Sequence, residues 1–154
     1  MKISRQLALA AAATLAVTML TGCAPTINLE PGALANDPAC AEIIVRLPST
    51  VAGFEKRTTN AQATGAWGNP TAVILRCGLE PVEISSLTCV TASDIDWLVD
   101  DSESPSYRFI SYGRSPATEV IVDSTQVAGV TALEELAGAV QSIEATKRCT
   151  AVTN

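Results

Sequence analysis

Four cysteines constrain the fold of this chain more than any other feature: Cys40, Cys77, Cys89 and Cys149. An even number of cysteines in an exported domain predicts two disulfide bonds, which can join four cysteines in three ways. The spacings contain no Cys-x-x-Cys pair, which argues against a structural zinc site. The chain has no histidine to activate a free nucleophilic thiol.

The start of the chain has the three parts of a bacterial export signal. Lys2 and Arg5 give it positive charge, and residues 7–20 form an uncharged, largely apolar run of 14 residues. A membrane-spanning helix needs about 20 such residues, so a removable signal over residues 1–22 is favoured over an uncleaved anchor. The run ends in Leu20-Thr21-Gly22-Cys23, the pattern of a lipobox, in which the cysteine receives a diacylglycerol and becomes the first residue.

Lipidation at Cys23 predicts a protein held on the extracytoplasmic face of the cell membrane, because two acyl chains such as palmitate anchor a protein stably. The lipid-anchored residues 23–36 contain Pro25, Pro31 and Gly32, which interrupt any periodicity and predict a flexible tether. Residues 37–154 are the length of a single domain.

Composition excludes several functions. The absence of histidine excludes Ser-His-Asp and Cys-His catalysis and histidine metal sites. With the signal removed, eight basic and sixteen acidic residues remain, a net charge of about −8. This charge argues against nucleic acid as a partner and against adsorption to anionic lipid. We expect no cofactor and no metal.

Two helices are predicted, one near each end of the domain. Asp37 is a good N-cap, Pro38 suits the first helical position, and apolar residues follow at helical spacing until Pro48. The last helix is predicted to begin at Thr131, with Glu134 completing a capping box, and to end near Cys149. Its final turn would contain Glu144, Lys147 and Arg148.

Strands are predicted between the helices. Residues 49–70 are rich in Gly, Thr and Asn and are expected to form a loop-rich stretch, whereas 71–75 are mostly apolar and predict a buried strand. Residues 86–91 predict a weaker strand, and alternation at 95–99 predicts a strand with one buried face before a polar turn at 100–105. Residues 107–112 and 118–122 predict a hairpin.

This order of elements predicts an α+β fold, a small antiparallel sheet with the N-terminal and C-terminal helices packed on one face. Because Cys40 and Cys149 belong to the two terminal helices, we expect them to pair. Cys77 and Cys89 flank one connection between strands, and we expect the second disulfide there.

Several motifs together resemble the DUF3515 family of actinobacterial proteins, which are secreted or lipid-anchored and of unknown function. The resemblance covers about residues 37–148. It rests on these motifs: Asp37-Pro38-x-Cys40, Trp67-Gly68-x-Pro70, Leu75-Arg76-Cys77-Gly78, Cys89, Asp96-Trp97 and Tyr112-Gly113-Arg114-x-Pro116-Ala117-x-Glu119-Val120. The resemblance implies an actinobacterial envelope protein and supplies no catalytic residues.

Two arginines and two tryptophans form the candidate ligand site: Arg76, Arg114, Trp67 and Trp97. Together they would suit a carboxylate or phosphate ligand. The structural alternative is that Arg76 pairs with Glu119 or Glu83 and that the tryptophans fill the core, since most buried charges are paired.

Two other chemistries are considered. Gly113-Arg114-Ser115-Pro116-Ala117 is close to the Gly-x-Ser-x-Gly elbow of hydrolases, but Pro116 has no N–H to donate to an oxyanion, and a strand follows. The spacing of the acidic residues does not fit an EF-hand, so a solvated, acidic strand and turn is expected instead of a calcium site. These residues are Asp94, Asp96, Asp100, Asp101 and Glu103.

The sequence therefore predicts a cell-envelope lipoprotein of unknown molecular function that is not an enzyme. The leading hypothesis is an accessory factor that binds an envelope protein and is itself anchored to the membrane through Cys23. The alternative is a lipoprotein that binds a small ligand in the Arg/Trp pocket. Two carboxylates about 5–10 Å apart in one cleft would instead indicate a glycan-cleaving enzyme.

Overall fold

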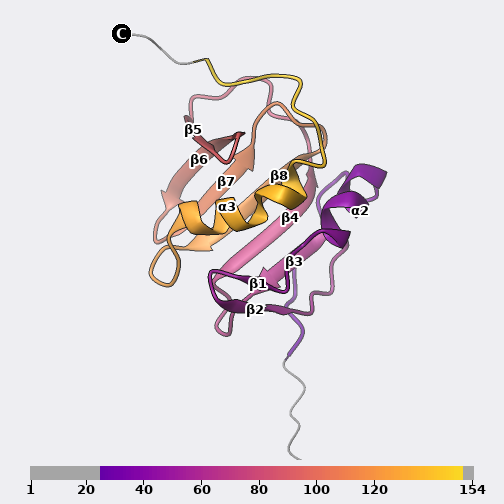
Figure 1. The fold of residues 1–154 in the computed structure, drawn as a ribbon, viewed down its shortest axis with the longest axis vertical. Coiled ribbons are helices and arrows are strands. Elements are labelled where there is room, and N and C mark those ends of the chain that lie inside the picture. The colour runs from indigo at the N-terminus through magenta and orange to yellow at the C-terminus, as the bar shows by residue number, and fades with distance from the viewer. Residues whose placement is uncertain (1–24, 151–154) are drawn as a thin grey trace, which may run out of the picture.

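The computed structural model describes residues 25–150, so the predicted signal peptide and the lipidation at Cys23 lie outside the described residues. Eight strands form one antiparallel sheet in the order β1-β2-β3-β4-β8-β7-β6-β5, and two helices pack against it (Figure 1). The fold is mostly β and fits the predicted α+β class. In the described part of the chain, no helix has the length and apolar character needed to cross a membrane.

The bounds of the elements follow the chain in order. The first half contains α2 (Pro38–Val45), β1 (Thr50–Val51), β2 (Phe54–Arg57), β3 (Thr64–Trp67) and β4 (Val73–Leu79). The second half contains β5 (Thr88–Ala92), β6 (Ile95–Glu103), β7 (Ser106–Ser111), β8 (Ala117–Asp123) and α3 (Gly129–Val140).

The sheet has two differently covered faces. One face, called the core face here, carries the large side chains of the main buried cluster, among them Trp67, Leu75, Trp97 and Val120. The opposite face carries a smaller apolar cluster of Leu98, Ile110 and Ala117. Because both faces are covered at the start of β6, residues 95–98 are all buried. The prediction of one buried face for this strand is therefore wrong at its N-terminal end.

Helix α2 begins as the sequence predicts. The Asp37 side chain accepts a hydrogen bond from the Ala39 N–H at 2.8 Å, and Pro38 occupies the first helical turn. Cys40 and Ile43 are buried on the side of the helix that packs into the core. The capping and the apolar stripe therefore agree with the structure.

Helix α3 differs from the prediction at both ends. It begins at Gly129, with Ala128 at the N-cap and no side-chain cap, so the capping box at Thr131 and Glu134 is wrong. It ends at Val140, so the cationic residues 147 and 148 lie beyond its last turn. The start is fixed by packing instead: a Cβ on Gly129 would lie 2.6 Å from the Phe109 ring. Tertiary contact has overridden the capping signal.

Residues 49–70 contain three short strands, β1, β2 and β3, which the prediction of a loop-rich stretch missed. Ala52 and Gly53 have positive φ angles of 50° and 79° and form the two-residue turn between β1 and β2. Turns of this kind are recognised in sequences by Asn-Gly or Asp-Gly, and the Ala-Gly here gives no such signal. Trp67 then pairs with Val73 of β4 and is buried.

The N-terminal segment, residues 25–36, is held against the sheet along much of its length. The Ile27 N–H donates to the Thr58 carbonyl at 2.8 Å, and the Leu34 N–H donates to the Gly78 carbonyl at 2.7 Å. Strand β4 runs past the end of β3, and Leu34 occupies the edge of β4 that β3 leaves free. The prediction of a free tether is therefore wrong for this segment.

All four cysteines form disulfides, but the predicted pairing is wrong. The bonds join Cys40 to Cys77 and Cys89 to Cys149. Cys77 lies on the core face of β4, where Cys40 of α2 packs. Strands β4 and β5 are consecutive in the sequence, yet β8, β7 and β6 separate them in the sheet, so Cys77 and Cys89 are not neighbours.

Peptide mapping without reduction is expected to recover the Cys40–Cys77 and Cys89–Cys149 links. Replacing Cys40 and Cys77 together by alanine should lower the free energy of unfolding by about 4 kcal/mol, because a loop of this length is no longer closed in the unfolded chain. Urea unfolding of the variant and the parent measures this difference. A Cys40–Cys149 peptide in the native protein would contradict the structure.

Candidate functional site

The structure does not bring the four predicted ligand residues together. Trp67 and Trp97 are fully buried on the core face, as the structural alternative predicts. Arg76 points to the opposite face, where its register partner is Glu119. Arg114 is buried after the end of β7. An Arg/Trp pocket built from these residues is therefore absent from the described part of the chain.

Arg76 belongs to an ion-pair cluster centred on a buried carboxylate. Glu119 has no exposed surface, and Arg76 Nε donates to its Oε1 at 2.6 Å. Arg108 Nε donates to the other oxygen, Oε2. Both arginine side chains keep 30–39% of their surface exposed. The pairing of Arg76 with Glu119 confirms the structural alternative and gives the arginine a partner within the fold.

Arg114 stabilises the chain that follows α3. Only 5% of its surface is exposed, and one of its terminal nitrogens donates to the Ile143 carbonyl. Burial lowers the pKa of Arg114, the nearby Arg148 lowers it further, and Asp96 opposes both effects.

The acidic side chains of β6 accept hydrogen bonds from other groups of the same chain. Asp96 is buried and accepts hydrogen bonds from the Thr91 hydroxyl and the Cys149 N–H, at 2.7 and 2.8 Å. Two hydrogen bonds from Ser102 lower the pKa of Asp100. Within residues 25–150, the group with metal-ligand spacing is Cys89, Asp96 and Cys149. Its two sulfurs are bonded to each other, so neither is available as a thiolate ligand.

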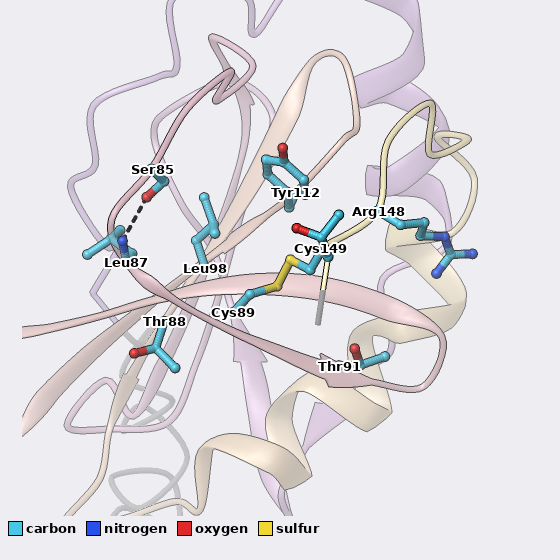
Figure 2. Close-up of a pocket in the computed structure, with 10 residues that line it drawn as sticks. Ser85, Leu87, Thr88, Cys89, Thr91, Leu98, Tyr112, Arg148 and Cys149 are labelled. Carbon is cyan, nitrogen blue, oxygen red and sulfur yellow. Dashed lines mark hydrogen bonds between the residues drawn. A yellow bond between two sulfur atoms is a disulfide. The ribbon is translucent and has the colours of Figure 1, made fainter. Parts of the chain in front are cut away.

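A cleft of about 590 Å³ lies beneath the C-terminal tail (Figure 2). Its walls come from the loop before β5, from β5 and β6, and from the tail. The lining residues are Ser85, Leu87, Thr88, Cys89, Thr91, Leu98, Tyr112, Arg148, Cys149 and Thr150. Apolar and hydroxyl side chains alternate around it, so the cleft suits a ligand or segment of mixed polarity.

The tail that forms one wall is held at several points. The Cys89–Cys149 disulfide joins it to β5, and the Cys149 N–H bonds to Asp96. Arg148 donates to the Asp94 carbonyl at 2.8 Å. In Figure 2 its guanidinium points away from Tyr112 and the disulfide. These contacts therefore fix the wall of the cleft that the tail forms. The one arginine that lines the cleft does not point into it.

A second, apolar pocket of about 310 Å³ lies on the core face, beyond the start of α3. It is lined by Val90, Val99, Tyr107, Phe109, Val122, Ser124, Gly129 and Val130. Val130 is 54% exposed and Val90 38% exposed, both at the rim of this pocket. The pocket exists because α3 starts at Gly129 and leaves this part of the core face uncovered.

Strand β5 separates the two cavities and forms one edge of the sheet. A two-residue turn, Ser93-Asp94, joins β5 to β6, so the pair Ala92 and Ile95 is hydrogen-bonded. By the alternation of an antiparallel ladder, the backbone N–H and C=O groups of Cys89 and Thr91 then point outward. No hydrogen bond within residues 25–150 uses these outward groups.

Sequence reasoning missed both cavities and the open edge. Thr88–Ala92 is uncharged and lacks proline, the residues that usually protect an edge strand, but strand order decides whether it lies at an edge. Ser115 is exposed in a turn before β8, so the nucleophile-elbow context is absent, as the sequence predicts.

The sequence matches a protein family. A family model described as "Protein of unknown function (DUF3515)" matches residues 6–149. No curated protein and no solved structure matches the chain.

Replacing Glu119 by glutamine should lower the free energy of unfolding by about 1–3 kcal/mol, because the buried amide N–H groups would then face arginine donors and lack an acceptor. Urea unfolding measures the change. Glu42→Gln is the matched control: its pair with Arg46 is exposed, and the expected change is within about 0.5 kcal/mol. Equal, small changes in both variants would contradict a structural role for the Glu119 cluster.

Proposed function

The chain belongs to the DUF3515 family of proteins of unknown function, and from this premise we propose that it is a non-enzymatic, lipid-anchored protein outside the cytoplasm. In this proposal it binds an extended segment of a partner protein along β5. The lipobox at Cys23 supports the anchor, and two disulfides support an oxidising compartment.

The observation that carries the proposal is the open edge of β5 between two cavities. An extended segment can add to the sheet by hydrogen bonding to the outward groups of Cys89 and Thr91. Its alternate side chains would then lie toward the apolar pocket at Val90 and toward the cleft at Tyr112. Backbone bonds would supply affinity, and the two cavities would supply specificity.

The same geometry suggests the chemistry of the partner segment. On the side of the apolar pocket it needs aliphatic or aromatic residues, because the lining of that pocket is almost entirely apolar. The domain carries a large negative charge, which favours a partner with basic residues and speeds their encounter. In this proposal both helices cover the core face, and the uncovered strip beside α3 receives the partner.

The second candidate function is binding of a small ligand in the cleft. Its size falls within the range of ligand pockets, and Tyr112, Leu98 and the hydroxyls of Ser85, Thr88 and Thr91 line it. This candidate uses none of the arginines and tryptophans that the sequence singles out. It predicts binding that does not depend on the outward edge of β5.

A photocrosslinking amino acid at position 130, beside the apolar pocket, should form one discrete adduct with an envelope protein in intact cells. Position 45 on α2 is the matched control, since Val45 is also an exposed valine, at 76%, and lies outside both cavities. Adding Val90→Glu should abolish the adduct at 130, because a charge would then face the partner's apolar residues.

Immunoblotting and mass spectrometry of the adduct measure this result. The crosslinked peptide of the partner should contain alternating apolar residues. The same adduct from positions 130 and 45, or an adduct that survives Val90→Glu, would contradict docking along β5. Native mass spectrometry of the purified domain with a retained small molecule would instead favour the cleft as the binding site.

A further inference from the structure

We propose that the domain stands upright on the membrane, with the end that holds Pro25 against the bilayer and the cleft facing away from it. This inference rests on the proposed lipidation of Cys23. It concerns how the anchored domain is oriented, which determines where a partner must come from.

The docked N-terminal segment carries the first step. Arg57 bridges two carbonyls, donating to Pro25 at 2.7 Å and to Gly68 at 2.8 Å. Ile27 then forms a parallel bridge with Thr59, and its N–H donates to the Thr58 carbonyl at 2.8 Å. The chain is therefore bound to the β2 and β3 end of the sheet from Pro25 onward.

The segment stays bound as it leaves this end. The Leu29 N–H donates to the Asn60 side chain at 2.8 Å, and Arg76 donates to the Glu30 carbonyl at 3.2 Å. Farther along, Gly78 has a φ of +101°, and a Cβ there would lie only 2.4 Å from the Ala35 nitrogen. Contacts of this kind along the segment make its release as a long tether costly.

The length of chain between the lipid and the first bound residue carries the second step. Cys23 and Pro25 are two residues apart, so their Cα atoms lie within about 7 Å of each other. A free tether of thirteen residues would instead span on the order of 20 Å and let the domain rotate. With the short connection, the surface around Pro25 must lie next to the headgroups.

The positions of the chain ends carry the third step. Figure 1 shows the start of the described chain at one end of the long axis and its last described residues at the other. Thr150, Cys149 and Arg148 at that far end line the cleft. An anchor at the near end therefore directs the cleft away from the membrane.

Local charge is compatible with this orientation. Strand β2, beside Pro25, contains Lys56 and Arg57 against one acid, Glu55, in a chain that is strongly acidic overall. Basic residues near an anionic bilayer are attracted to its surface. The acidic residues Asp101 and Glu103 are in the last part of β6, and four strands separate β6 from β2 in the sheet.

The test uses the mature lipidated chain on vesicles of phosphatidylglycerol and phosphatidylethanolamine that contain a headgroup quencher. A fluorophore is attached through a non-natural amino acid at position 69, in the turn beside Gly68, or at position 84, in the loop before β5. Asn69 and Ile84 are both exposed. Quenching should be several-fold stronger at position 69, because the turn there lies beside the anchor, whereas the loop at position 84 lies at the cleft.

The control variant carries twenty Gly/Ser residues between Ala24 and Pro25, and it should remove most of the difference between the two positions. Equal quenching of both labels on the lipidated chain without this insertion would overturn the upright orientation and leave the proposed lipoprotein intact. A chain whose intact mass lacks the lipid, and which does not float with vesicles, would overturn both.

Discussion

The close contact between Gly78 and the N-terminal segment joins parts of the molecule that are distant in the sequence. A side chain at this position would collide with the backbone of Leu34 and Ala35. The preceding residue, Cys77, binds α2 through its disulfide, and Arg76 pairs with Glu119 across the ladder to β8. Three consecutive residues of β4 therefore attach the N-terminal segment, the first helix and the neighbouring strand.

The energies of the ion pairs distinguish the buried pairs, which stabilise the fold, from the pairs exposed on the surface. Glu119 is fully buried, and leaving such a carboxylate without its cationic partners would cost several kcal/mol. The exposed pair of Arg46 with Glu42 is worth at most about 1 kcal/mol. Arg76 attracts attention in the sequence as a charge at the end of an apolar run. Its partner shows that it stabilises the sheet and is not free to bind an anionic ligand.

Local signals in the sequence predict the elements that depend on local chemistry. The cap at Asp37 and the hairpin of β7 and β8 are examples, since nearby residues alone determine them. The strand order cannot be predicted in this way, and the disulfide pairing depends on it, because three strands separate β4 from β5. The same holds for the candidate site. Both cavities and the open edge exist because β5 is the last strand of the sheet and α3 starts at Gly129.

The two edges of the sheet are protected to different degrees. Strand β1 has two residues, and the backbone N–H of Ala52, directly after it, donates to Glu135 of α3 at 2.9 Å. A short edge next to a helix offers little to another strand. Strand β5 has five uncharged residues and a cavity on each side. Proteins usually block such an edge with charge, proline or a covering segment. Within residues 25–150 the tail is joined to β5 through the Cys89 disulfide, and no hydrogen bond there uses the outward backbone groups, which favours an edge that is covered by a partner.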